Sequence, residues 1–385
     1  MKIDLPFHKA WLEEAEHFEV TETLNSGWLT SGPKTKNFEE AFSGYIGCKH
    51  AIALNSCTAG LNLALGMHGF PEGDEVITTT MTFPATANVV MLQKMKPVLV
   101  DIEPGTLLID PKKIEEKITA RTRAIIPVHF AGHPCAMDTI NDLAEKYKLL
   151  VIEDAAHALE TKYKGKKIGN MGNTTSFSFY ANKNITTGEG GMVVTNDDEL
   201  AKQFQVMRLQ GISRDAWKRY GRAGYTHWEQ QMAGHKCNMS DINASIGIHQ
   251  LKKIDSFLNI RRKYVAKYDR GFADVPEIET LACHDRVDHA HHLYIIALRL
   301  EKLTVDRDAF LDAMQESGIG VAVHYIALHL QPFYMKNFNT KPQDYPIASS
   351  YSERIMSIPL YPKMSENDVE RVIETIRDLV TKFRR

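Results

Sequence analysis

Three features that could do chemistry together lie within one stretch of the chain, residues 149–196. Asp154 ends the apolar run 149–153, Lys183 follows a short alternating segment at 175–180, and a glycine-bearing turn occupies 187–191. A desolvated lysine loses its proton more easily and can attack a carbonyl carbon. A carboxylate at the carboxyl end of a buried strand can pair with a protonated ring nitrogen. These residue types suit an enzyme that handles carbonyl compounds.

A second set of residues could bind an anion. The chain runs from a short apolar segment, 51–54, through a turn of small residues, 55–60, into a helical pattern at 61–67. Backbone N–H groups at the start of a helix favour a phosphate. Thr58 and Ala59 would donate to it, with Ser178 as a further hydroxyl. We therefore hypothesise that Lys183 carries pyridoxal 5′-phosphate (PLP) and that Asp154 holds its ring nitrogen.

Each of these residues also has a structural interpretation. Lys183 could be an ordinary surface lysine, Asp154 a helix N-cap, and the turn at 55–60 a plain helix cap. Phe83 could stack on a planar cofactor or pack in the core. His157 could lie against the ring or form a structural hydrogen bond. The histidines at 284, 289, 291 and 292 match no standard zinc spacing, so we expect no metal site.

The elements around these residues alternate between apolar strands and helices from about residue 51 to residue 208, which indicates a buried, mostly parallel sheet. A helix at 241–251 precedes a basic helix at 255–272. Beyond it we expect strands at 292–300 and 320–325 and helices at 306–316, 347–356 and 365–382. We predict a large cofactor-binding domain, 1–254, and a smaller C-terminal domain, 255–385.

Composition excludes several functional classes. The 385-residue chain is 43% hydrophobic and 24% charged, with a formal net charge of −2. No basic block suggests nucleic acid or an anionic membrane surface. Five scattered cysteines form no CxxC pair and suggest reduced thiols. The amino terminus does not resemble a signal peptide, and no apolar run could cross a bilayer, so we expect a cytoplasmic protein.

Taken together, the chain resembles the DegT/DnrJ/EryC1/StrS family of sugar-nucleotide aminotransferases over nearly its whole length. The motifs that carry the resemblance are Ser26-Gly27-Trp28 with Gly32-Pro33, Asn55–Ala59, Gly73–Ile77, Pro127–Gly132, Glu153–His157, and Ser176–Phe179 continuing through Lys183 to Gly191. The resemblance implies PLP-dependent transferase fold type I, like that of aspartate aminotransferase. Its large α/β domain would hold a mostly parallel sheet, followed by a smaller α+β C-terminal domain.

The resemblance also implies roles for individual residues. Lys183 would form the Schiff base and shuttle a proton, and Asp154 would pair with the pyridine nitrogen. Phe83 and His157 would flank the ring, while Thr58, Ala59 and Ser178 would hold the phosphate. The family is dimeric, and a partner subunit usually reaches the phosphate with an asparagine from a GYNYRM-like segment. Here the segment is 234–239, with Lys236 in the asparagine position and Asn238 in the arginine position.

The resemblance is strongest to the branch that transfers an amino group from L-glutamate to C4 of a UDP-linked 4-keto sugar. Thr30, His324, Tyr325 and His329 would face the sugar nucleotide, and the polar segment Gly211–Gly234 would cross to the partner or cover the nucleotide. A GDP-perosamine synthase-like enzyme and a C3-aminating transaminase stay open. So do a PLP-dependent sugar dehydratase, although its branch lacks the lysine, and a non-catalytic sensor or scaffold. The sugar, the nucleotide and the pathway stay open too, whether lipopolysaccharide, capsule or flagellin glycan.

Overall fold

The computed structural model of the chain describes residues 3–212 and 229–385. Its centre is a seven-stranded sheet in the order β1-β9-β8-β5-β4-β2-β3. The strands are β1 (His50–Leu54), β2 (Glu75–Thr79), β3 (Lys96–Val100), β4 (Thr122–Ile126), β5 (Leu150–Asp154), β8 (Thr174–Ser178) and β9 (Gly191–Thr195). Strand β9 runs antiparallel to both of its neighbours, and the other pairings are parallel. The predicted mostly parallel sheet is confirmed.

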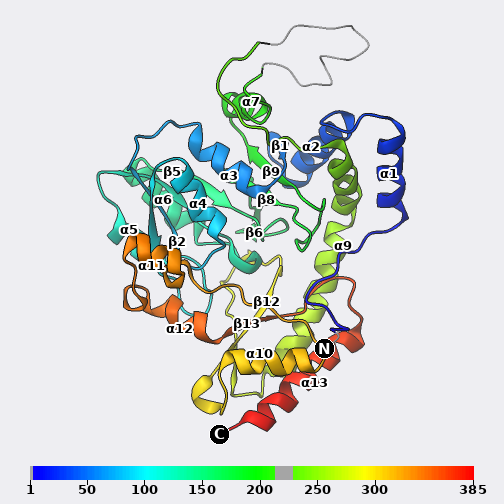
Figure 1. Cartoon of the computed structure of the whole chain (residues 1–385), viewed down its shortest axis with the longest axis vertical. Helices are drawn as coiled ribbons and strands as arrows, with labels where there is room; N and C mark the ends of the chain where they lie inside the picture. The colour runs from blue at the N-terminus through cyan, green and yellow to red at the C-terminus, as the bar shows by residue number, and fades with distance from the viewer. Residues whose placement is uncertain (1–2, 213–228) are drawn as a thin grey trace.

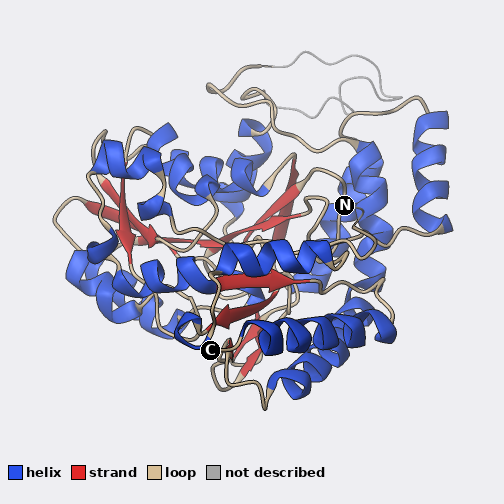
Figure 2. Cartoon of the chain, turned by 60° about the horizontal axis from the view of Figure 1, so that its bottom comes forward, coloured by secondary structure: helices blue, strands red, loops and turns tan. Residues whose placement is uncertain are grey.

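Helices cover both faces of this sheet (Figure 2). One face packs against α3 (Cys57–Gly66), α4 (Pro84–Leu92) and α7 (Asp198–Met207). The other packs against α2 (Pro33–Ile46), α5 (Pro111–Lys117), α6 (Met137–Tyr147) and the first half of α9 (Asp241–Phe272). The strands read as continuous apolar runs because successive side chains enter opposite cores. In β9, Val193 packs towards α3, whereas Met192 and Val194 pack towards α2.

Helix α9 links the two parts of the chain. It is one helix of 32 residues, so the prediction of separate helices at 241–251 and 255–272 is wrong. Its first half packs against α1 (Glu14–Asn25) and α2, and its last turns place Tyr264, Tyr268 and Phe272 in the C-terminal core (Figure 1). The proposed domain boundary between residues 254 and 255 falls inside α9 and stays a prediction.

The C-terminal part is built on a three-stranded antiparallel sheet in the order β10-β12-β13. Its elements are β10 (Ile278–Thr280), β12 (Tyr294–Leu298), α10 (Arg307–Glu316), α11 (Pro332–Phe338), α12 (Pro346–Arg354), β13 (Ile355–Ile358) and α13 (Glu366–Phe383). A small sheet joins β6 (Lys162–Tyr163), β7 (Lys166–Lys167) and β11 (Val287–Asp288). Short 3-10 helices lie at Phe130–Gly132, Leu300–Lys302, Leu328–Leu330 and Pro342–Asp344. Near the amino terminus, Leu5 pairs with Ile319 and packs in the C-terminal core.

One predicted C-terminal element is wrong. The segment 320–325 is not a strand, because it crosses the end of β13 and pairs there only through the Ala322–Ser357 bridge. The helix predicted at 347–356 is confirmed as α12, although it ends at Arg354 and the chain continues directly as β13. Residues 213–228 of the polar segment Gly211–Gly234 lie outside the described residues. None of the described helices combines the length and apolar character that a bilayer crossing demands.

Candidate active site

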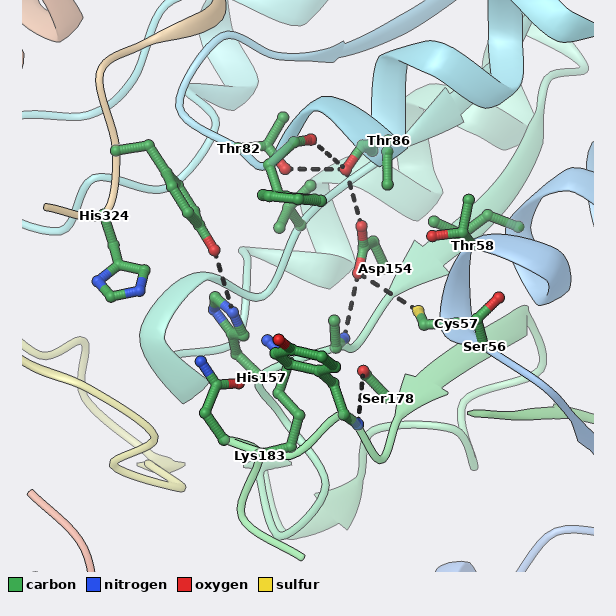
Figure 3. A pocket seen from close by; sticks show the side chains of 18 of the residues that line it. Ser56, Cys57, Thr58, Thr82, Thr86, Asp154, His157, Ser178, Lys183 and His324 are labelled. Atoms are coloured by element: carbon green, nitrogen blue, oxygen red, sulfur yellow. Dashed lines mark hydrogen bonds between the residues drawn. The ribbon is translucent and has the colours of Figure 1, made fainter. Parts of the chain in front are cut away.

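A cavity of about 450 Å³ opens where β2, β5 and β8 end and the C-terminal segment 324–325 reaches the sheet. The parallel strands bring their carboxyl ends to one edge, which is where α/β sheets bind ligands. Eight of the predicted site residues line the cavity (Figure 3): Thr58, Phe83, Asp154, His157, Ser178, Lys183, His324 and Tyr325. Residues up to 267 positions apart in the chain, Thr58 and Tyr325, therefore meet at one site.

Lys183 lies on the loop between β8 and β9. Its backbone N–H donates to the carbonyl of Tyr180 at 2.9 Å, and Thr187 N–H donates to Phe179 at 3.0 Å to close the loop. Gly188 turns the chain with φ +78°, a conformation that other residues adopt at a cost. The Lys183 ammonium forms no hydrogen bond or ion pair with the described residues. Burial lowers its pKa to about 8, so the amine is close to its reactive form at neutral pH.

Asp154 is the last residue of β5. Its Oδ2 accepts from the Thr86 hydroxyl at 2.8 Å, and its Oδ1 accepts from the Ala156 N–H at 3.1 Å. Burial raises the pKa of the carboxyl, and these two donors oppose that shift. Glu153 points to the opposite face of the strand from Asp154 and binds His129 Nε2 at 2.8 Å.

The turn before α3 forms the side of the cavity next to β8. Ser56 caps the helix, since its Oγ accepts from the Ala59 N–H at 3.1 Å. The Ala59 amide, expected to meet a phosphate, therefore donates within the turn, and Ala59 is not among the cavity residues. Thr58 and Ser178 bring hydroxyls to the cavity beside the positive end of the helix dipole. A Cβ at Gly191 would lie 2.3 Å from the backbone of Ser56, so only glycine permits this close approach.

Aromatic side chains form the opposite wall. The Phe83 ring is 59% exposed, although most phenylalanines are buried, and it lies 6.1 Å from the ring of Tyr325. His157 is buried and accepts from the Ala131 N–H through Nδ1 at 3.3 Å. Burial lowers its pKa well below the ordinary value, so the imidazole is neutral. These rings leave planar surfaces beside Lys183 and Asp154.

The remaining predicted residues have different environments. His324 lines the cavity, binds Ser357 Oγ through Nδ1 at 2.9 Å, and has a pKa that burial lowers to about 4. His329 is fully buried and lies outside the cavity. Its two ring nitrogens bind Thr80 Oγ1 and Ser349 Oγ. Thr30 and Lys236 are exposed and do not line the cavity, and Lys236 Nζ binds Asn238 Oδ1.

Sequence reasoning missed several residues of the cavity. They are Cys57, Thr82, Thr86, Tyr180, Asn182 and Glu189, among others. The segment 82–86 offered one signal, since Pro84 predicts a helix start and a threonine stands on each side of it. The contact of Thr86 with Asp154 joins positions 68 residues apart, and local patterns do not encode that distance.

Four histidines form a cluster away from this cavity. The ring of His133 lies 4.8 Å from that of His284 and 5.4 Å from that of His289, which stacks on His291 at 4.3 Å. Across residues 3–212 and 229–385, no three His, Cys, Asp or Glu side chains are arranged to hold a metal ion.

The donor set of the cavity fits PLP. A lysine with a lowered pKa suits the aldehyde, and a buried carboxylate suits the pyridine nitrogen. The Thr58 hydroxyl at the start of α3 and the Ser178 hydroxyl at the end of β8 suit the phosphate, and the exposed face of Phe83 suits the ring.

Comparison with known proteins gives three close relatives. An uncharacterised protein of Methanocaldococcus jannaschii is 51% identical, over 99% of this chain and 98% of its own. The spore coat polysaccharide biosynthesis protein SpsC of Bacillus subtilis is 46% identical, over 98% of this chain and 97% of its own. The PLP form of Spr1654, a provisionally assigned sugar aminotransferase of Streptococcus pneumoniae, superposes with a TM-score of 0.91. It is 35% identical over 98% of this chain and 99% of its own, and it has also been solved in a PMP form.

These findings establish the fold class and the cofactor. The chain has fold type I of the PLP-dependent transferases, and its cofactor is PLP. The family model for the DegT/DnrJ/EryC1/StrS aminotransferases matches residues 11–377, almost the whole chain. This protein is therefore a member of the DegT/DnrJ/EryC1/StrS aminotransferase family.

Proposed function

We propose that this aminotransferase moves the amino group of L-glutamate to C4 of a nucleotide-linked 4-keto sugar, with UDP as the nucleotide, for a surface polysaccharide or glycan. The observation that carries the proposal is the convergence of the Lys183 amine and the Asp154 carboxylate on one cavity. SpsC supports the polysaccharide assignment by its name, and Spr1654 supports a sugar substrate by its name.

Each side chain has a defined task in this proposal. PLP, when bound, withdraws electrons from the carbon that carries the amino group. Asp154 holds the pyridine nitrogen protonated by pairing with it. Lys183 holds the cofactor and, once released, moves a proton through Nζ, for which a pKa of about 8 is suitable near neutral pH. Thr58 and Ser178 would bind the phosphate, and Phe83 and His157 would flank the ring.

The sugar nucleotide would lie on the side of the C-terminal segment. His324 and Tyr325 bring one neutral imidazole and one phenol into the cavity, and both can form hydrogen bonds with hydroxyls. Thr30 is exposed and does not line the cavity of its own chain, and it stays a candidate. His329 has both ring nitrogens bound inside the chain, which argues against a substrate contact.

We further propose a homodimer with shared sites. Lys236 is exposed and lies outside the cavity of its own chain, so it is available to a neighbouring subunit. A lysine can meet a phosphate as a point charge in place of the usual asparagine.

Two incubations test the activity. With glutamate alone, the protein should release one 2-oxoglutarate per site while the bound cofactor takes the absorbance of its pyridoxamine form. The protein in its pyridoxamine form should then aminate one member of a panel of UDP-, GDP- and dTDP-linked 4-keto sugars. NMR of the sugar product distinguishes amination at C3 from amination at C4. Elimination of water from the sugar without 2-oxoglutarate release would instead identify a dehydratase. Absence of both reactions would support a sensor or scaffold.

A further inference from the structure

A line of buried hydroxyl groups ends on Asp154. Thr82 Oγ1 lies 2.8 Å from Thr86 Oγ1, and Thr86 Oγ1 lies 2.8 Å from Asp154 Oδ2 (Figure 3). The three side chains are 2%, 0% and 5% exposed. Pro84 begins α4 with Phe83 as its N-cap, so Thr82 lies just before the helix and Thr86 in its first turn, where the two hydroxyls meet. The same segment carries Phe83, so the ring wall and the hydroxyl line are positioned by one helix start.

The direction of the hydrogen bonds follows from proton counting. An ionised carboxylate only accepts, so the single hydroxyl proton of Thr86 goes to Asp154. The Thr86 oxygen then accepts the proton of Thr82. The alternative acceptor for Thr86, the Phe83 carbonyl, lies farther away at 3.4 Å. Thr82 therefore orients the hydroxyl that faces the carboxylate.

The acceptor positions of Asp154 leave room for a ligand. A carboxylate offers about four lone-pair positions. Oδ1 receives the Ala156 N–H at 3.1 Å and faces the Cys57 thiol at 4.0 Å, while among the described residues Oδ2 receives only Thr86. One position on Oδ2 stays available to an N–H group inside the cavity.

The charge of Asp154 depends on its donors. Burial alone favours the neutral acid, and hydrogen bonds from Ala156 and Thr86 favour the carboxylate by lowering its pKa. If a donor is removed, the carboxyl competes more strongly for the proton that it shares with a basic nitrogen. The pair then shifts from pyridinium–carboxylate towards pyridine–carboxylic acid.

We propose that Thr86, oriented by Thr82, is a positioning residue that keeps Asp154 ionised opposite the ring nitrogen of PLP. The proposal rests on the cofactor orientation in the proposed function. Through Asp154, the two threonines set how strongly the ring nitrogen is protonated, and so how well the cofactor withdraws electrons.

The test uses holoenzyme carrying PLP labelled with ¹⁵N in the ring, together with stopped-flow measurement of the glutamate half-reaction. In Thr86→Val the ¹⁵N resonance should move towards that of neutral pyridine. The saturating rate should fall on the order of 10-fold, as expected for a hydrogen bond to a charged group, with half-saturating glutamate unchanged. Thr86→Ser should restore both properties, and Thr82→Val should change both in the same direction but less.

A matched control is Thr78→Val, because the Thr78 hydroxyl is equally buried and donates to the Ile126 carbonyl at 2.8 Å, away from Asp154. It should leave the resonance and the rate unchanged. A wild-type resonance and rate in Thr86→Val, or a Thr86→Ser variant that behaves like valine, would overturn the proposal. If Thr86→Val does not bind PLP, Thr82→Val and Thr86→Ser decide the outcome by the same readouts.

Asp154→Asn distinguishes a failure of the role assigned to Thr86 from a failure of the proposed cofactor orientation. If it shifts the ring nitrogen and Thr86→Val does not, only the role of Thr86 is refuted. If Asp154→Asn leaves the resonance unchanged, the ring nitrogen does not face Asp154, and the proposed cofactor orientation fails.

Discussion

The hydroxyl of Tyr325 lies 3.4 Å from Nε2 of His157, which joins the C-terminal segment to the end of the central sheet. Because His157 Nδ1 accepts from the Ala131 N–H, its proton resides on Nε2 and points to the Tyr325 oxygen. The proton of the Tyr325 hydroxyl is then available to a ligand in the cavity.

Removal of that hydroxyl should weaken only the sugar half of the reaction. For Tyr325→Phe we expect kcat/KM for the keto sugar to fall about 10-fold, the loss of one hydrogen bond, with the glutamate half-reaction unchanged. Tyr45→Phe, which removes an outer hydroxyl bonded to Asp255, is the control. Equal slowing of both half-reactions would place Tyr325 on the cofactor instead.

The lowered pKa of Lys183 gives a pH prediction. Only the neutral amine attacks an aldehyde, so capture of PLP by the apoprotein should speed up as the pH rises through about 8. A free lysine side chain requires a pH near 10.4. The measurement is the rate of absorbance change after PLP is added at several pH values, with N-acetyl-lysine as the reference amine. A protein midpoint equal to that of the reference would refute the desolvated environment of Lys183.

The histidine cluster should make the fold sensitive to acid. Burial lowers the pKa of His133 to about 3 and of His291 to about 4, and lowers that of His289 well below its ordinary value. Histidines whose pKa is lowered in the folded state stay neutral there. Their contribution to the free energy of unfolding is therefore full above about pH 6.5. It falls as the pH drops below 6.5, by up to about 1.4 kcal/mol per pH unit for each histidine.

We therefore expect Tm to fall between pH 7.5 and pH 5.5, and to fall less in His289→Gln. His17→Gln, on the exposed side of α1, is the control and should keep the wild-type difference. A wild-type pH difference in His289→Gln would contradict this account of the cluster.

The shared-site proposal predicts complementation between two defective chains. Lys183→Ala should be inactive, and Lys236→Ala should bind PLP more weakly because a phosphate contact is lost. A mixed dimer contains one site with both lysines intact if Lys236 serves the partner, so co-refolded chains should regain PLP-dependent activity. If Lys236 instead serves its own chain, each site of the mixed dimer lacks one of the two lysines. No regain of activity in the mixture would contradict the cross-subunit assignment.

The sequence predicted which residues line the cavity better than it predicted their hydrogen-bond partners. Asp154 and Ser178 end strands that short apolar patterns reveal, and Lys183 follows in the loop after β8, so their common edge followed from the parallel sheet. The direction of β9 did not follow, because its apolar pattern is the same in either direction. The burial of the His329 ring could not be predicted, because Thr80, 249 residues away, binds it. Thr86 was missed for the same reason, since it lies on α4 and its partner Asp154 lies 68 residues away at the end of β5.

The central claim is that Lys183 carries the cofactor, and borohydride reduction tests it most directly. The purified yellow protein, reduced and digested, should yield one pyridoxyl-modified peptide, with the modification on Lys183. Lys183→Ala should be colourless, unmodified and unable to form 2-oxoglutarate from glutamate. A modification on another lysine, or an alanine variant that transaminates at the wild-type rate, would contradict the account.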